Sequence, residues 1–189
     1  MSDESPDFAG VAPALLVSMP QLVDPNFHRT VILLCEHGAE GAFGLVLNRR
    51  TETSAASVVR LSFPVEIDRG LELWTGGPVE PERGWILTAT EPSDTEAVRV
   101  SDGVYLSTSQ ELLRQLLAKP QAPETRLLTG YAGWSAGQLD AELSSSAWLT
   151  AEADADIIFG TQPADMWETT IRRLGADPLL LQMGGQSVH

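Results

Sequence analysis

Cysteine is almost absent from this sequence, which contains only Cys35 among 189 residues. One cysteine excludes an intrachain disulfide, and chains without disulfides are typical of reducing, cytoplasmic compartments. The first ten residues, MSDESPDFAG, lack the basic and apolar regions of a secretory signal peptide. No apolar run approaches the roughly 18 residues that are needed to cross a bilayer. We therefore expect a soluble cytoplasmic protein with no membrane association.

Basic residues are also scarce. Lysine and arginine number 12 against 26 acidic residues, the formal net charge is −14, and both halves of the chain are acidic. Because nucleic-acid affinity depends largely on lysines and arginines that displace counterions, direct DNA or RNA binding is disfavoured. Two local basic pairs remain, Arg49 with Arg50 and Arg172 with Arg173.

The apolar content of 43% is sufficient for a core, and the length suits one domain. We expect a disordered N-terminus over residues 1–9, a single domain over 10–177 and a C-terminal tail over 178–189. The leucines of the tail either cover an exposed sheet edge or contact another subunit. The sequence gives no indication of the oligomeric state.

Short runs of β-branched and aliphatic residues predict strands. The predicted strands are RTVILLC (29–35), FGLVLN (43–48), LELWTGG (71–77), GWILTAT (84–90), a hairpin in VRVSDGVYLST (98–108), RLLTGYAGW (126–134) and ADIIFG (155–160), after a first apolar run LLVSMP (15–20). Segments 36–42 and 79–84 are expected to be loops. The first two strands are expected to form a central hairpin that is buried on both faces.

Helices are predicted where capping residues precede an apolar stripe. Thr108 and Glu111 have the spacing of a capping box, and Pro163 suits a first helical position. A weaker helical pattern covers residues 51–66. Strands and helices do not alternate strictly, which predicts an α+β fold with a mixed, largely antiparallel sheet flanked by helices.

The stretch GYAGWSAGQLDAEL (130–143) combines several glycines with two aromatic residues. Ser135 and Gln138 have the spacing of a capping box, and Trp134 and Leu139 have that of a hydrophobic staple. The helix start is therefore explained without a ligand. The glycines leave two interpretations open, namely close packing or backbone donors for a binding surface.

Cys35, Glu36 and His37 form the most reactive cluster in the sequence. On a strand, Cys35 and His37 share a face, which permits a redox-sensitive thiol, a catalytic pair or two metal ligands. The simpler interpretation is a buried cysteine at the end of a core strand and a histidine in a turn. The alternation EADAD (152–156) indicates a solvated acidic strand face or a weak cation site. No established catalytic, cofactor or metal motif is present, so we predict no cofactor and no metal.

Several motifs follow one another in a specific order: MPQLVDPNFHRTVILLCEHGAEGAFGLVLNR, TGGPVEPERGWIL, GYAGWSAGQLDAEL followed by AWL, then IIF and a Trp-containing helix that ends in LG. Together they resemble the AlgH (YqgE) family of bacterial proteins over residues 12–177. The resemblance implies an α+β fold with a coiled, partly barrel-like mixed sheet. One branch of that family was named as a regulator of alginate production. No catalytic residues are established for the family.

The resemblance also marks positions characteristic of the family. Those taken as a candidate binding surface are Glu36, His37, Asn48, Gly76, Gly77, Pro78, Tyr131, Gly133, Trp134, Gly137 and Gln138. Gly76, Gly77 and Pro78 form either a rigid turn or the lining of a groove with Trp74 and Trp85. The family usually has proline where this chain has Arg50, and a histidine where it has Thr88.

Three functions follow, in order of preference. The first is a non-enzymatic regulator that contacts another protein, with Trp134 as an exposed anchor. The second is a protein, either an enzyme or a non-catalytic binder, that binds a small molecule or nucleotide through the glycine-rich turns. The third is a direct transcriptional regulator, which the acidic charge disfavours.

Overall fold

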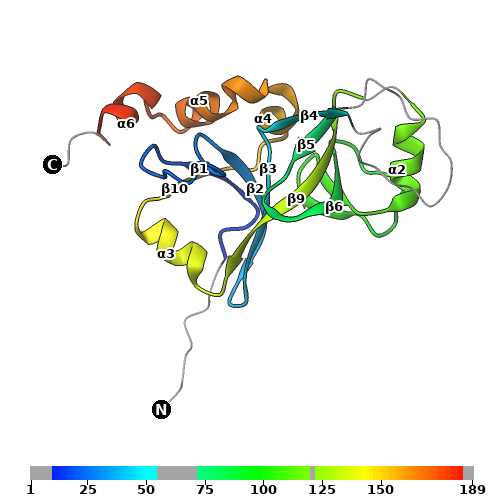
Figure 1. Ribbon diagram of the computed structural model, residues 1–189, viewed down its shortest axis with the longest axis horizontal. Coiled ribbons are helices and arrows are strands. Elements are labelled where there is room, and N and C mark those ends of the chain that lie inside the picture. The colour runs from blue at the N-terminus through cyan, green and yellow to red at the C-terminus, as the bar shows by residue number, and fades with distance from the viewer. Residues whose placement is uncertain (1–9, 55–71, 120–121, 185–189) are drawn as a thin grey trace, which may run out of the picture.

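The computed structural model describes residues 10–54, 72–119 and 122–184 of the chain (Figure 1). The expected disordered N-terminus lies outside these ranges, as does most of the weak helix predicted over 51–66. The described residues form an α+β fold in which one curled, half-barrel sheet of ten strands carries five helices. No helix in the described residues is long and apolar enough to cross a membrane.

The sheet is antiparallel except for one strand pair. Its main path runs β10 (Trp148–Ala151), β1 (Ala14–Ser18), β2 (Val31–Gly38), β3 (Gly41–Val46), β9 (Thr125–Ser135), β6 (Val79–Thr88), β8 (Val104–Ser107) and β7 (Val98–Ser101). Off this path, β4 (Arg50–Ser54) pairs with β5 (Glu72–Thr75), which runs parallel to β9. The long strand β9 joins the two halves, because its last residues pair with β3 and its first residues pair with β5 and β6.

The aliphatic parts of β2 and β3 are buried on both faces, as predicted, and β1 is buried in the same way. Alternate residues point to opposite sides of a strand, so Leu15 and Leu33 enter one core cluster while Leu16 and Ile32 enter another. The first cluster lies under α4 (Ala155–Gly160) and α5 (Pro163–Arg173), and the second packs on α3 (Gln138–Ser144) (Figure 1).

Two further helices complete the described fold. Helix α2 (Gln110–Leu117) covers a third cluster around Leu73 and Ile86. Helix α6 (Pro178–Gly184) follows α5 and exposes three large apolar side chains, those of Leu179, Leu180 and Met183. These side chains therefore do not cover a sheet edge.

Two segments predicted as loops belong to strands. Strand β2 extends to Gly38 and β3 begins at Gly41, so the loop expected over 36–42 shrinks to a tight turn. Strand β6 begins at Val79 and includes the predicted VEPERG loop, because a register shift between Val79 and Gly84 absorbs the irregular residues.

The predicted strand ADIIFG is helix α4. Asp154 caps it by accepting a hydrogen bond from the Asp156 backbone N–H at 2.8 Å, while Ile157 and Ile158 are buried. A short apolar run does not distinguish a buried strand from a buried helix. Here the Asp154 cap favours the helix. The EADAD segment is thus not an acidic strand face. Helix α2 also begins one residue later than expected, with Ser109 as its cap instead of Thr108.

Candidate functional site

The predicted glycine positions lie mostly where two chain segments approach each other closely. A Cβ atom on Gly130 would be 2.2 Å from the Gly77 carbonyl oxygen, and one on Gly77 would be 2.1 Å from the Tyr131 carbonyl carbon. Gly76 has a similarly short approach to Gly130, at 2.4 Å. Gly76, Gly77 and Pro78 therefore form a tight crossing with β9, where glycine is needed for packing.

Trp134 is buried instead of exposed. Its indole N–H and that of Trp148 both donate to Glu142 Oε2, at 2.9 and 2.7 Å. Only 6% of Trp134 is exposed, and it shares a core cluster with Leu139, as the staple spacing predicts. The side chain is thus part of the core and does not serve as an interface anchor.

Helix α3 begins at Gln138, not after Ser135. Its cap is Gly137, whose φ of +75° favours glycine, and Ser135 remains in β9. One bond of the predicted capping box is present, since the Ser135 backbone N–H donates to Gln138 Oε1 at 3.1 Å. Gly133 lies on β9 beneath the ring of Tyr131, which a Cβ atom would approach to 3.3 Å.

His37 and Cys35 have separate partners. The Val11 backbone N–H donates to His37 Nδ1 at 3.1 Å, which places the ring proton on Nε2, 3.4 Å from the Asp140 carboxylate. Cys35 instead packs against the core, and burial together with the charge of Glu36 raises the pKa of its thiol to about 12. This environment opposes a thiolate, so the geometry does not support an activated cysteine. Within the described ranges, no three histidine, cysteine or acidic side chains gather as a metal site would require.

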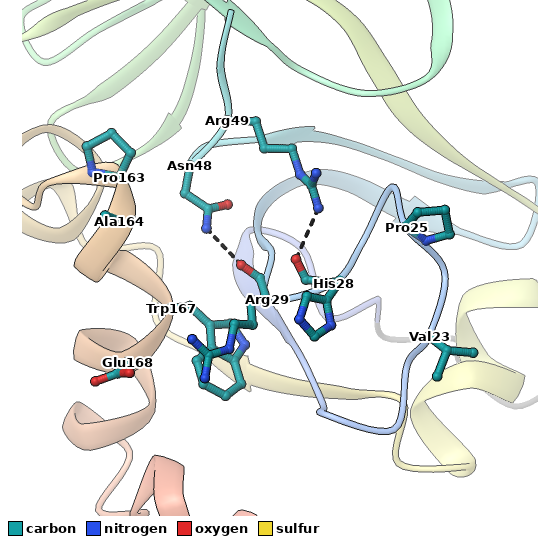
Figure 2. A pocket seen from close by; sticks show the side chains of 10 residues that line it. All are labelled: Val23, Pro25, His28, Arg29, Asn48, Arg49, Pro163, Ala164, Trp167 and Glu168. Carbon is teal, nitrogen blue, oxygen red and sulfur yellow. Dashed lines mark hydrogen bonds between the residues drawn. The ribbon is translucent and has the colours of Figure 1, made fainter. Parts of the chain in front are cut away.

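Asn48 shapes a cavity of about 600 Å³ between the loop after β1 and helix α5. Figure 2 shows its lining, which we call the Arg29 pocket: Val23, Pro25, His28, Arg29, Asn48, Arg49, Pro163, Ala164, Trp167 and Glu168. Asn48 Oδ1 accepts from the Val31 N–H at 3.0 Å and its Nδ2 donates to the Arg29 carbonyl at 2.9 Å. The Asn48 amide therefore fixes the loop that carries Arg29.

Arg29 is held in an uncommon way. Its φ is +48°, a left-handed conformation that costs energy for a residue with a side chain. The guanidinium lies 5.0 Å from the centre of the Trp167 ring, and Trp167 is fixed by donating to the Ser18 carbonyl at 2.8 Å. Within the described residues, the Arg29 guanidinium makes no hydrogen bond or ion pair.

The charge in the Arg29 pocket is positive. Arg49 also lines the pocket, and its Nη2 donates to the His28 carbonyl at 3.0 Å and to Thr30 Oγ1 at 3.2 Å (Figure 2). The one acidic lining residue, Glu168, pairs with Arg172 at 3.2 Å. Two guanidinium charges therefore face this pocket without an acidic partner in the described residues.

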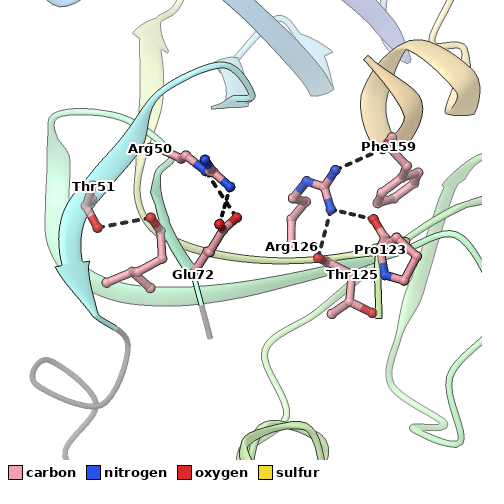
Figure 3. A network of polar contacts seen from close by, with 8 residues as sticks. Arg50, Thr51, Glu72, Pro123, Thr125, Arg126 and Phe159 are labelled. Carbon is pink, nitrogen blue, oxygen red and sulfur yellow. Dashed lines mark hydrogen bonds and ion pairs between the residues drawn. The ribbon is translucent and has the colours of Figure 1, made fainter. Parts of the chain in front are cut away.

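A second cavity, of about 350 Å³, is lined by Arg50 and Arg126, whose guanidinium groups lie 5.5 and 5.2 Å from the centre of the Trp74 ring. Figure 3 shows that Arg50 pairs with Glu72, while Arg126 donates to the carbonyls of Pro123, Thr125 and Phe159. Burial lowers the pKa of Arg126 below its ordinary value, and the nearby charge of Glu72 opposes that shift. This network ties β9 to helix α4, and its arginines are already engaged.

A third cavity, of about 420 Å³, holds two more of the predicted residues, Glu36 and Tyr131. Phe43, Trp85 and Tyr131 form an aromatic cluster, with ring centres 4.8 to 6.1 Å apart. We call it the Tyr131 cavity. Its remaining lining residues are Arg83, Glu96, Val98, Leu106, Ser107 and Thr108.

The predicted site residues are thus distributed over several places. Asn48 lies in the Arg29 pocket, Glu36 and Tyr131 line the Tyr131 cavity, and Gly76 and Gly77 form the crossing with β9. Arg29 and Trp167 were not predicted. Their signal in the sequence is weak, because it consists of one arginine in an acidic chain and one tryptophan in an amphipathic helix.

Comparison with known proteins places this fold in a family. Residues 15–179 match the AlgH-like family. A UPF0301 protein of Myxococcus xanthus is 40% identical over 177 residues, which cover 92% of this chain and 96% of that protein. A UPF0301 protein of Photobacterium profundum is 39% identical over 179 residues, covering 89% and 94%.

Two solved structures are similar. The solution structure of the AlgH protein from Pseudomonas aeruginosa superposes with a TM-score of 0.76 at 35% identity, with both chains fully covered. The crystal structure of protein DIP2367 from Corynebacterium diphtheriae gives a TM-score of 0.71 at 23% identity, over 93% of this chain and 92% of that one, and supports the fold alone. From the family match, the sequence relatives and the shared architecture together, the chain belongs to the AlgH-like family.

Proposed function

We propose that the protein is a non-catalytic cytoplasmic regulator that contacts another protein, and that the Arg29 pocket holds an acidic group of that partner. The observation that carries this proposal is the guanidinium of Arg29, which is stacked on Trp167 and has no acidic partner in the described residues. Stacking on the ring face leaves the N–H groups at the edge of the guanidinium plane available. That edge matches the two oxygens of a carboxylate.

The pocket is built to hold Arg29 in place. Asn48 fixes its backbone, Trp167 fixes its side chain, and Arg49 adds a second positive charge. Backbone conformations that cost energy concentrate at binding sites and are maintained by the surrounding contacts. A preorganised guanidinium loses little conformational entropy on binding, which favours recognition of a carboxylate.

The same charges argue against direct binding of nucleic acid. Six arginines pair with acidic side chains, and these are Arg50, Arg83, Arg99, Arg114, Arg172 and Arg173. A nucleic-acid surface needs many cations that are free to replace counterions. The positive charge of the Arg29 pocket is confined to a small area, which suits one acidic group.

A small anionic metabolite is the second candidate for this pocket. Its volume of about 600 Å³ supports this alternative, because small-molecule sites commonly enclose roughly 300–1,000 Å³. The glycine-rich turns, by contrast, contact one another, so the backbone-donor version of this hypothesis has less support.

A titration followed by amide NMR distinguishes these candidates. The probes are a blocked Asp-Glu-Glu tripeptide and citrate, added separately to the wild-type protein and to Arg29→Asn. Asparagine tolerates the left-handed conformation, so this change removes the guanidinium with little added backbone strain. A charge-assisted hydrogen bond contributes about 1.5–3 kcal/mol, so we expect Arg29→Asn to weaken peptide binding by roughly 10-fold or more.

The matched control is Arg99→Asn, which removes the same charge from an exposed arginine on β7. A protein partner is supported if the tripeptide shifts the amide signals around residues 28, 29 and 167 and if the Arg99→Asn control shows the same shifts. Citrate binding far more tightly than the peptide at the same residues supports the metabolite. Equal binding by a folded Arg29→Asn variant contradicts both.

A further inference from the structure

The Tyr131 cavity differs from the Arg29 pocket in both its walls and its charge. Phe43, Trp85 and Tyr131 provide an aromatic wall, and Glu36 and Glu96 provide two carboxylates. Aromatic faces attract cations through the ring quadrupole, and carboxylates strengthen that preference. The cavity therefore has the chemistry of a site for a positively charged group.

The two carboxylates are available to a ligand. Neither the Glu36 nor the Glu96 side chain makes a hydrogen bond or an ion pair within the described residues, and both are exposed. The other charged lining residue, Arg83, already pairs with Glu80 at 3.3 Å. The cavity thus has an excess of negative charge in a protein whose net charge is −14.

Arg83 shows which cation this wall accepts. Its guanidinium lies 4.7 Å from the centre of the Trp85 ring, so the ring already carries an arginine from the same chain. Arg83 is exposed, and its ion pair with Glu80, three residues away, is also exposed. Such pairs stabilise a side-chain position only weakly, so Arg83 is easily displaced from the Trp85 ring. A hydrogen bond to Glu80 raises the pKa of Tyr131 above its ordinary value, which keeps the Tyr131 hydroxyl protonated and neutral beside the cavity.

The sheet edge beside the cavity suits an extended ligand. Strand β7 is the last strand of the main path among the described residues, and its Val98 lines the cavity with 60% of its surface exposed. An unpaired strand edge binds extended peptides through backbone hydrogen bonds, while neighbouring pockets select their side chains.

We propose that the Tyr131 cavity binds an arginine side chain on an extended segment of a partner protein. The incoming guanidinium replaces Arg83 on the face of Trp85 and pairs with Glu36 and Glu96. This site is independent of the Arg29 pocket, which has the opposite charge, and either assignment stands or fails without the other.

The test is an NMR titration of the full chain with a blocked Val-Arg-Val tripeptide. Its comparison probe is Val-citrulline-Val, in which a neutral urea group replaces the guanidinium at nearly the same shape. We expect saturable shifts at Glu36, Ser107 and Tyr131 with the arginine peptide, and much weaker shifts with the citrulline peptide.

Three variants assign the contacts. Glu36→Gln combined with Glu96→Gln should raise the dissociation constant about fivefold or more, since it removes two ion pairs. The charge-matched double variant Glu91→Gln with Glu152→Gln, at exposed positions outside the described cavities, should change it less than twofold. Arg83→Gln should lower the dissociation constant about two- to fivefold, because it removes the competing guanidinium.

Equal shifts with both peptides, or unchanged affinity in a folded Glu36 and Glu96 double variant, would overturn the proposal. Weaker binding by Arg83→Gln would also overturn it, because Arg83 would then be a required wall of the cavity. If the double variant fails to fold, the citrulline comparison and Arg83→Gln still decide the question.

Discussion

At the scale of single residues, several polar side chains are used to fix the structure. Glu142 accepts the indole protons of both Trp134 and Trp148, and Asn48 joins β2 to the loop at Arg29. Buried polar groups are costly unless they are bonded, so these contacts specify one arrangement of the chain. Arg29 is different, since its guanidinium is positioned but has no hydrogen bond within the described residues.

Cys35 gives a direct test of this description at one residue. Because burial and Glu36 raise its pKa from 9.0 to about 12, the thiol stays protonated at pH 8. We expect iodoacetamide to alkylate the folded protein more than about 100-fold more slowly than the urea-unfolded chain. Equal rates measured by mass spectrometry would contradict the burial of this thiol.

The same shift predicts a dependence of stability on pH. The pKa of the Cys35 thiol is higher in the folded protein than in the unfolded chain. The unfolded chain therefore loses this proton first, and the contribution of Cys35 to the unfolding free energy is complete below about pH 9 and is lost as the pH rises through about 12. The unfolding free energy of the wild type, measured relative to Cys35→Ala, should therefore fall over that range. A difference that does not change with pH would argue against the shift.

At the scale of elements, strand β9 organises the molecule. It pairs with β3, β5 and β6, and its Gly130 adopts a left-handed conformation where it crosses Gly77. The apolar runs predicted most of the strands, because buried strands need continuous aliphatic residues. The apolar pattern failed at α4, because a run of six residues is compatible with either a strand or a helix. The hydrogen bond to the Asp154 side chain at the start of this segment favours the helix. The capping-box spacing also failed at the start of α3, because Gly137 adopts a left-handed conformation and caps the helix two residues after Ser135.

Because Gly130 crosses Gly77 so closely, we expect a single added methyl group at Gly130 to lower the free energy of unfolding considerably. In Gly130→Ala the new methyl group would lie 2.2 Å from the Gly77 carbonyl oxygen, at a φ of +73°. The backbone conformation alone costs roughly 1–2 kcal/mol for alanine, and the collision adds to it. We expect urea unfolding to report a loss of at least about 2 kcal/mol. Gly84→Ala is the control, because a Cβ atom there meets nothing within 4 Å; equal losses in the two variants would count against the close crossing.

At the scale of the whole molecule, two cavities are lined by charged residues of opposite sign, basic in the Arg29 pocket and mainly acidic in the Tyr131 cavity. The chain is strongly acidic, six of its arginines are paired within the described residues, and two guanidinium groups gather in the Arg29 pocket. The family and the α+β fold were predictable from motifs spread along the sequence. The pocket was not, because it joins Arg29 to Trp167 across 138 positions of the chain, a contact that no local pattern encodes.

Comparative affinity capture tests whether the Arg29 pocket binds a protein partner in cells. Tagged wild-type protein, Arg29→Asn and Arg99→Asn would each be recovered from the protein's own cells, with retained proteins and metabolites identified by mass spectrometry. We expect one recurrent protein that is captured by the wild type and by Arg99→Asn, is released by raised salt, and is lost with folded Arg29→Asn. Undiminished capture of that protein by Arg29→Asn would contradict this expectation.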